Sequence, residues 1–208
     1  ILFNKITSIT MQKTLFTSLF IAIFSFSTIA SALSTGFVDT QNHWSKNYVN
    51  ILKDQCGITG YLDKYGQALG EFHPDSPITR AELVKIIFQC SKTDLFSSTS
   101  KTLKDLPANA WFTPYVNWAI AKGLVEGYSD NTFRPNNYIN RAEALKIITL
   151  AKFPANQITG GTSKFADVPN SAWFAKYVGF ALSHNYISGY PDGSFRPANQ
   201  LTRAEAAK

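Results

Sequence analysis

The sequence has 208 residues, of which 45% are apolar and 16% are charged, and its formal net charge is +6. The apolar content allows a packed core and excludes a largely disordered chain, while the length allows one or two modest domains. The basic excess favours an anionic partner, but the lysines and arginines form no run of the kind that binds nucleic acid.

The beginning of the chain has the pattern of an export signal. Met11 is the only methionine, and it opens a short basic start, a mostly apolar run over Leu15–Ile29 and the small residues Ala30-Ser31-Ala32. This pattern predicts a secretory signal peptide over residues 11–32, with cleavage after Ala32. A transmembrane anchor is the alternative, but the run of about fifteen residues is shorter than the roughly twenty that a span needs.

Residues 1–10 precede Met11 and fit no export signal. We interpret them as an upstream or non-native extension, with translation from an alternative start codon as the other reading. Export removes Lys5 and Lys13 but no acidic residue, so the exported part keeps eighteen basic and fourteen acidic residues and a net charge of +4. We expect no membrane span in that part.

The two cysteines, Cys56 and Cys90, are separated by 34 positions. In an exported protein they are free to form a disulfide, and two buried thiols are the alternative. Their spacing matches no zinc motif, and the three histidines are scattered along the chain. We therefore expect no metal site and no cofactor.

The chain contains one unit three times. Residues 103–151 align without a gap with residues from 165 onward, at a constant offset of 62 positions. In the first copy, Trp44 and Arg80 are 36 positions apart, whereas the equivalent tryptophan and arginine are 30 positions apart in the second and third copies. The first copy therefore has six extra residues, around Lys64–Gly70. The repeat predicts three modules, at residues 37–91, 103–153 and 165–208, the last of them truncated at its C-terminal end.

Each copy begins with a predicted helix and a turn-rich loop. In the second copy the residues from Trp111 to Lys122 have three-to-four spacing, typical of an amphipathic helix, and Gly123 is placed to end it. The loops GYSDNTFRP and GYPDGSFRP follow in the second and third copies. Their Asp-Asn and Asp-Gly pairs favour tight turns, so we assign structural roles to Asp130 and Asp192.

A second helix closes each copy, and in the second copy we expect Leu145, Ile148 and Ala151 on its apolar face. A unit of about fifty residues is too small to bury its aromatic side chains alone. The sequence therefore predicts a mainly α fold, in which three tandem helix-loop-helix repeats pack as a pseudo-threefold helical bundle.

The second helix of each copy starts with a repeated motif, which reads ITRAELVK, INRAEALK and LTRAEAAK. Ser/Thr-x-x-Glu ahead of an apolar periodic run indicates a capping box, and asparagine is an equally good cap. The predicted capping pairs are Thr79 with Glu82, Asn140 with Glu143, and Thr202 with Glu205.

Capping does not explain the arginine in each motif, at Arg80, Arg141 and Arg203. A cation in the first helical turn opposes the helix dipole by about 0.3–1 kcal/mol. Two explanations remain open. The arginines form ion pairs with acids of the fold, or each guanidinium and its helix N-terminus make a receptor for carboxylate or phosphate. The repeated acids that suggest the first explanation are Asp39, Asp105 and Asp167.

These repeated motifs resemble S-layer homology (SLH) modules. The resemblance rests on the F-x-D start, the W-A-x-x-Y-V-like helix, the G-Y-x-D-G-x-F-x-P loop and the T-R-A-E motif, and it covers about residues 37–208. It implies non-covalent attachment of an exported protein to the bacterial cell wall or S-layer. The implied partner is an anionic, pyruvylated secondary cell-wall polysaccharide or a peptidoglycan-linked glycan. We expect no nucleic acid among the partners.

The resemblance also implies a pseudo-trimer of modules with binding grooves between neighbours. It assigns contact with the acidic sugar to the arginine of each T-R-A-E motif, at Arg80, Arg141 and Arg203. We add further candidates for the groove lining from each module's aromatic and glycine-containing segments, with core packing as the alternative for the tryptophans. These candidates are Trp44, Trp111, Trp173, Gly127 and Gly189.

The motifs of catalysis are missing from this sequence: it has no nucleophile elbow, no H-E-x-x-H and no phosphate loop. We therefore predict a binding protein with no enzyme activity in these residues. Two alternatives concern sequence beyond residue 208. In the first alternative, the modules are the N-terminal anchor of an extracellular enzyme, such as a xylanase-type polysaccharide hydrolase. In the second, they are the SLH region of a porin-type outer-membrane protein that binds peptidoglycan.

Overall fold

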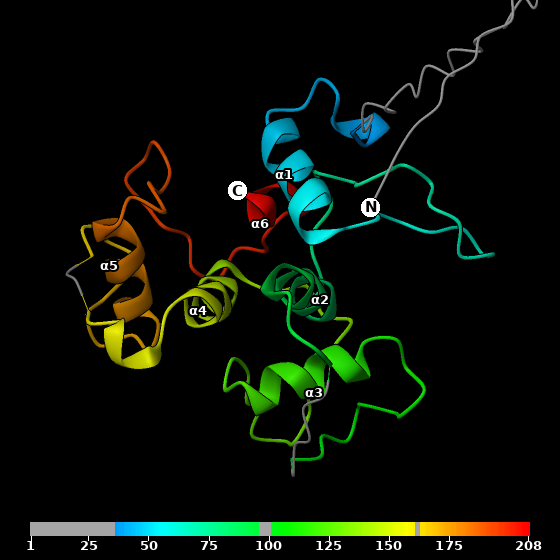
Figure 1. Cartoon of the computed structure of the whole chain (residues 1–208). Helices are drawn as coiled ribbons and strands as arrows, with labels where there is room; N and C mark the ends of the chain where they lie inside the picture. Colours follow the sequence, from blue (N-terminus) through cyan, green and yellow to red (C-terminus); the bar gives the residue numbers. More distant parts are fainter. Residues whose placement is uncertain (1–35, 96–100, 161–162) are drawn as a thin grey trace, which may run out of the picture. The chain divides into compact units, whose positions relative to one another are not determined.

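The computed structural model of the protein describes residues 36–95, 101–160 and 163–208, and these ranges contain six α-helices (Figure 1). The mainly α fold expected from the sequence is confirmed, and pairing between extended segments of these ranges is limited to isolated bridges. The predicted N-terminal extension and signal peptide lie outside the described residues. The helices are α1 (Lys46–Cys56), α2 (Arg80–Ser91), α3 (Thr113–Ala121), α4 (Arg141–Lys152), α5 (Ala175–Ser183) and α6 (Arg203–Ala207), with 3-10 turns at Val38–Thr40 and Ala155–Gln157.

Each module supplies one helix pair, and a left-handed residue ends the first helix of each pair. After α3, Gly123 has a φ of 70°. The N–H of Leu124 donates to the carbonyl of Ala119, and the N–H of Gly123 donates to that of Ile120, both at 2.9 Å. This pair of bonds is a Schellman motif, so Gly123 terminates the helix as the sequence predicts.

The prediction that Leu145, Ile148 and Ala151 form one buried apolar face of α4 is wrong. Ala144 and Ile147 are buried, at 1% and 3% exposure, whereas Ile148 is 36% exposed and Ala151 is also exposed. The helix packs against α2 and also against α5, so its buried positions are divided between two neighbours and do not form one simple stripe. Ile147 belongs to the cluster that contains residues of α2 and α3, while Leu145 packs on the cluster around α5.

A closed ring of backbone hydrogen bonds joins the three modules immediately before α2, α4 and α6. The N–H of Ile78 donates to the carbonyl of Leu201 (2.9 Å), Leu201 donates to Ile139 (3.0 Å), and Ile139 donates to Ile78 (3.1 Å). The three side chains are buried. Because each module donates to one neighbour and accepts from the other, the modules are related by pseudo-threefold symmetry.

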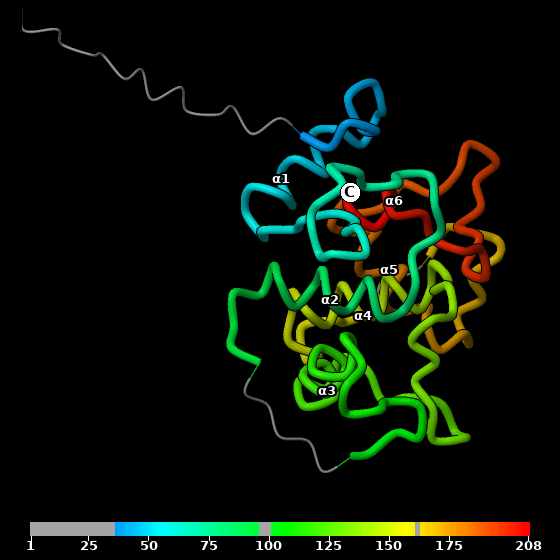
Figure 2. Tube along the Cα trace, turned by 90° about the vertical axis from the view of Figure 1, so that its right-hand side faces the viewer, coloured from blue at the N-terminus to red at the C-terminus, as the bar shows by residue number. Residues whose placement is uncertain are grey.

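The hydrophobic core follows the same symmetry. Equivalent positions of the three modules are buried, and α6 packs beside α1 although the two lie at opposite ends of the described chain (Figures 1 and 2). The repeated buried sets are Phe37, Leu103 and Phe165; Val49, Val116 and Val178; and Phe72, Phe133 and Phe195.

The six extra residues of the first module lengthen its loop into a hairpin. The N–H of Tyr61 donates to the carbonyl of Glu71 at 3.0 Å, as that of Tyr128 does to Thr132 at 2.8 Å in the shorter loop of the second module. The inserted residues pair further out, through a bridge between Leu62 and Ala68, and the hairpin extends away from the helices (Figure 1).

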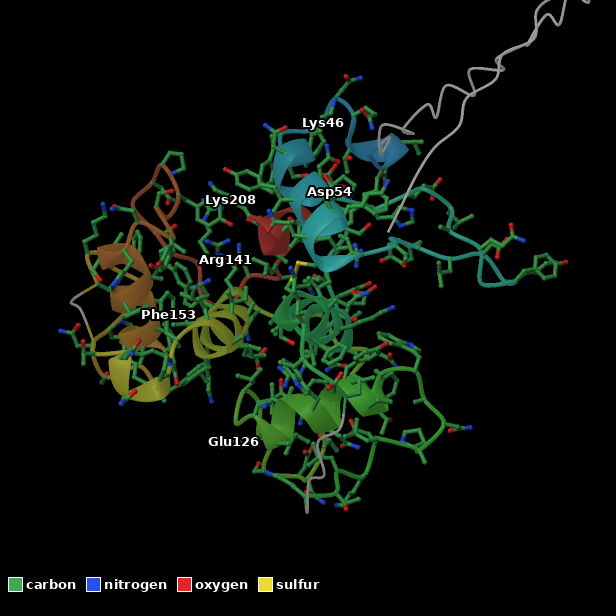
Figure 3. All side chains as sticks on the ribbon, viewed as in Figure 1. Lys46, Asp54, Glu126, Arg141, Phe153 and Lys208 are labelled. Atoms are coloured by element: carbon green, nitrogen blue, oxygen red, sulfur yellow. A yellow bond between two sulfur atoms is a disulfide. The ribbon has the colours of Figure 1, made fainter. Side chains whose placement is uncertain are left out.

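A disulfide joins Cys56 at the end of α1 to Cys90 near the end of α2 (Figure 3). It links the two helices of the first module, whereas the helix pairs of the other two modules have no such bond among the described residues. None of the described helices is long and apolar enough to cross a membrane.

Candidate functional site: three grooves between modules

Each groove is built around a loop that an aspartate holds in place. In the second module, the Asp105 carboxylate accepts hydrogen bonds from the backbone N–H groups of Phe133 (2.8 Å) and Arg134 (2.6 Å). Asp39 and Asp167 make the same contacts in the other modules. These aspartates are therefore engaged by backbone, and the proposed ion pairs between them and the arginines of the T-R-A-E motifs are wrong.

The arginine at the start of α2 reaches into the second module. The Arg80 Nε donates to the carbonyl of Phe133 at 2.8 Å, and Nη1 lies 3.3 Å from Oε2 of Glu143. The guanidinium also lies over the rings of Phe133 and Tyr128, 4.7 and 4.8 Å from their centroids. The acid that pairs with the arginine is thus the capping glutamate of the next module.

The same contact closes a cycle through all three modules. Arg141 bonds the carbonyl of Phe195 and pairs with Glu205 at 3.2 Å. Arg203 bonds the carbonyl of Phe72 and pairs with Glu82 of the first module at 3.3 Å. The arginine side chains are only 7% to 14% exposed. Burial on this scale requires each charge to be paired, which the cycle achieves.

Protein acceptors also occupy the helix N-termini. At α2, the N–H groups of Arg80 and Ala81 donate to the carbonyls of Asn137 and Pro135. The N–H of Glu82 donates to Oγ1 of Thr79 within a complete capping box, and α4 and α6 begin with complete boxes as well. A receptor that needs free N–H groups at these helix ends is therefore excluded. The Nη2 atoms of the three arginines have no acceptor among the described residues.

A tyrosine completes each junction. The hydroxyl of Tyr128 donates to Oε1 of Glu143 at 2.8 Å, and the guanidinium groups of Arg80 and Arg134 both lie over its ring, 4.8 and 4.0 Å from the centroid. Burial raises the pKa of Tyr128. Tyr190 has the same surroundings in the third module, while in the first module Tyr61 stacks on His73.

The loop turns are fixed by the aspartates to which we assigned structural roles. Asp130 accepts from the hydroxyl of Thr132 at 2.6 Å and from Nη2 of Arg134 at 2.9 Å. These hydrogen bonds lower the pKa of Asp130 to about 2. Asp192 makes the equivalent bonds to Ser194 and Arg196.

Three grooves lie at the module junctions. Groove A is lined by Arg80, Glu126, Gly127, Tyr128, Glu143, Lys146 and Trp173, together with apolar residues of the loop and α4. Groove B is lined by Arg203, Thr59, Gly60, Tyr61, Glu82, Lys85 and Trp111, with Leu62 and Tyr115 among its other residues. Groove C is lined by Tyr48, Arg141, Lys152, Asn185, Tyr186, Glu205 and Lys208, with apolar residues of α4. Figure 3 labels Arg141 and Lys208 of this groove.

One rule describes the composition of the three grooves. The arginine comes from one module, the loop and the Glu-Lys pair come from the next, and an aromatic side chain comes from the third. In groove A these are Arg80, the pair Glu143 and Lys146, and Trp173. A groove therefore exists only when all three modules are folded together.

The candidate tryptophans lie at the surface. Trp44, Trp111 and Trp173 are 55%, 51% and 54% exposed, so the core-packing alternative is wrong for them, and it is Trp118 that is buried in the core. Trp111 precedes the start of α3, which takes it off the buried face of that helix. Trp111 and Trp173 line grooves B and A, while Trp44 contacts Tyr48 beside groove C.

The candidate glycines are needed by the backbone. Gly127 lines groove A at a φ of 79°, and a Cβ there would lie 2.9 Å from the carbonyl oxygen of Thr132. Gly189 has a φ of 74° and is more crowded still, by Phe165 and the carbonyl of Ser194, but it does not line groove C.

Sequence reasoning missed the lysine of each groove. The Nζ atoms of Lys85 and Lys146 lie over the rings of Trp111 and Trp173, at 5.5 and 5.9 Å from the centroids. The signal was present, because a lysine stands five residues after the arginine in each of the three motifs. No cluster of three or more metal-ligand side chains occurs in the described ranges.

The fold and grooves define a protein built from three interlocked repeats with surface grooves at their junctions. The chain belongs to the S-layer homology domain family, whose model matches residues 36–84, 102–145 and 164–207. It is similar to the cellulosome-anchoring protein of Acetivibrio thermocellus (33% identical, over 73% of this chain and 36% of that protein) and to cell surface glycoprotein 1 of the same organism (32%, over 72% and 7%). The surface-layer 125 kDa protein of Lysinibacillus sphaericus is 29% identical over 77% of this chain and 13% of that protein. The chain thus spans 7% to 36% of the length of these relatives.

Proposed function

We propose that the three modules anchor an exported protein non-covalently to the bacterial cell surface, by binding an anionic, pyruvylated secondary cell-wall polysaccharide in the grooves. The family match and the surface-anchoring and surface-layer names of the relatives support attachment to the envelope. The observation that carries the choice of ligand is the repeated pairing of an exposed tryptophan with a lysine, next to a buried arginine, in grooves A and B.

The chemistry of the grooves fits a sugar that carries a carboxylate. Half-exposed indole rings offer flat apolar surfaces of the kind found in ligand-binding grooves. A pyruvate ketal adds a carboxylate to the sugar ring, and the lysine ammonium, together with the remaining Nη2 of the arginine, supplies charged donors for it. Each contact contributes about 1.5–3 kcal/mol, so durable attachment requires several grooves that bind one polymer at the same time.

Surface substitutions test this function better than substitution of the arginines, because removal of a buried arginine also breaks a junction between modules. The variant Trp44→Ala/Trp111→Ala/Trp173→Ala removes three exposed rings that lie outside the core. Binding would be measured by co-sedimentation with isolated cell walls that carry pyruvylated polysaccharide, and circular dichroism would confirm the fold of the variant.

We expect the wild-type protein to sediment with intact walls but not with walls stripped of the pyruvylated polysaccharide. The triple variant should bind at least about tenfold more weakly, since each lost aromatic contact lowers the combined affinity. Tyr65→Ala is the matched control, because Tyr65 is 75% exposed on the inserted hairpin and lines none of the three grooves. Equal binding of the wild-type protein to stripped and intact walls would show that the pyruvylated polysaccharide is not the ligand.

A further inference from the structure

Grooves A and B are built alike in most of their charged groups. Each contains an arginine paired with a capping glutamate, so these two charges offset one another. Each also contains a lysine over a tryptophan, Lys146 over Trp173 in groove A and Lys85 over Trp111 in groove B. Apart from the arginine–glutamate pair, the lysine is therefore the cation that each of these two grooves presents to an anionic ligand.

One further side chain makes the two grooves different. Glu126 lines groove A from the loop after α3 (Figure 3), directly before Gly127. It is exposed and has no hydrogen-bond or ion-pair partner within the described part of the chain. The equivalent residue of groove B is Thr59, directly before Gly60. The charged groups that line groove A are balanced, whereas those that line groove B have an excess of one positive charge.

The difference is placed where a ligand would sense it. Glu126 lines the same groove as Lys146 and Trp173, so a sugar seated on that indole meets both a cation and a free carboxylate. A like charge at a solvated protein surface changes the affinity for an anion by about fivefold, and salt screens the effect. A carboxylate also accepts hydrogen bonds from sugar hydroxyls, which suits a sugar without charge.

We propose that Glu126 determines which of grooves A and B takes the acidic sugar: groove B binds a carboxylated unit, and groove A disfavours it by about fivefold. This inference rests on the function proposed above. It adds that the grooves have separate preferences along the same polymer, with groove A left to an uncharged unit.

Each groove contains its own reporter, which makes the test direct. The probe is a synthetic methyl hexopyranoside with a 4,6-pyruvate ketal, and its methyl ester is the neutral control. Both would be titrated into the ¹⁵N-labelled protein while the indole N–H resonances of Trp111 and Trp173 are followed, after assignment with single Trp→Phe variants. Trp118 is the internal reference, because its buried indole donates to Thr93 away from the grooves.

With the ketal, the Trp111 resonance should shift at about fivefold lower concentration than that of Trp173, and this ratio should shrink in 0.5 M salt. Glu126→Thr should bring the two titrations together. The reciprocal change, Thr59→Glu, should weaken the response of Trp111 by a similar factor. Both substitutions are at exposed positions, so neither disturbs the core. The methyl ester should show none of these differences.

The outcomes separate this inference from the proposed function. Equal titrations in the wild-type protein, tighter binding at Trp173, or a ratio that Glu126→Thr leaves unchanged would overturn the role of Glu126 while wall anchoring stands. If neither indole responds to the ketal, and the protein does not sediment with intact walls, both proposals are overturned.

Discussion

At the scale of single residues, the glutamate of the T-R-A-E motif connects the three modules. In the second module, Glu143 caps its own helix by accepting a hydrogen bond from the N–H of Asn140. It also accepts a hydrogen bond from the hydroxyl of Tyr128 and forms an ion pair with Arg80 of the first module. One side chain thus joins a helix start, a loop and a neighbouring repeat. The arginine that opposes its own helix dipole is explained by this partner, because the charge pair is across the junction and not along the helix.

The buried pair predicts a large loss of stability when one partner is removed. Arg80→Met leaves Glu143 with an unpaired carboxylate at a site that is 21% exposed, and leaves the carbonyl of Phe133 without its donor. We expect the free energy of unfolding to fall by about 2–4 kcal/mol, because burying an uncompensated charge is costly. Urea denaturation followed by circular dichroism measures it.

Arg134→Met is the matched control. Arg134 also lies over the ring of the same tyrosine, but its ion pair with Asp130 is exposed, so the loss should be much smaller. The double variant Arg80→Met/Glu143→Gln should recover part of the stability that Arg80→Met loses. A cost for Arg80→Met no greater than that for Arg134→Met would contradict the structural role of the buried arginine.

The sequence was sufficient for features that are local in the chain. The helix caps, the turn aspartates and Gly123 depend on neighbours within about five residues, and those neighbours are visible in the motif itself. The partner of Arg80 is 63 positions away, at Glu143, and only the fold brings the two together. Trp111 was expected within the first helix of its module, but α3 begins only at Thr113, so Trp111 is not held on the buried face on which Trp118 and Ala119 lie.

At the scale of secondary-structure elements, the first module differs from the other two. Its loop is a hairpin, and its helix pair α1 and α2 is linked by the disulfide. The apolar cluster around α1 is small, with Phe37, Val49, Ile58 and Phe72 as its buried residues. A covalent link stabilises such a pair by limiting the conformations of the unfolded chain.

Removal of the disulfide should therefore destabilise the protein without changing its fold. The bond closes a loop with a sequence separation of 34, and for a loop of this length the chain-entropy model gives about 3–4 kcal/mol. We expect Cys56→Ser/Cys90→Ser to lower the free energy of unfolding by about that amount in urea denaturation. A reducing agent should have the same effect on the wild-type protein and none on the double variant. Equal stability with and without reductant would show that the bond contributes nothing.

At the scale of the whole molecule, the repeats form a closed cycle rather than an open stack. The backbone ring of Ile78, Ile139 and Leu201, and the arginine–glutamate cycle, both return from the third module to the first. Repeats that touch only their sequence neighbours have stabilities that add along the array. Here the last repeat supplies Arg203 to the first, so no module has a complete set of partners until all three have folded.

Closure predicts a single cooperative unfolding transition for the three modules. The indole resonances of Trp44, Trp111 and Trp173 each report one module, and we expect them to lose their native positions at the same urea concentration. Breaking the contact between the third and first modules, with Arg203→Met, should lower the midpoint for all three reporters together and not for the first module alone. Midpoints that differ between reporters by more than about 0.5 M urea would instead show that the modules unfold independently, as in an open array. A shared midpoint in both proteins means that the grooves form and disappear as a set, because each one takes side chains from all three modules.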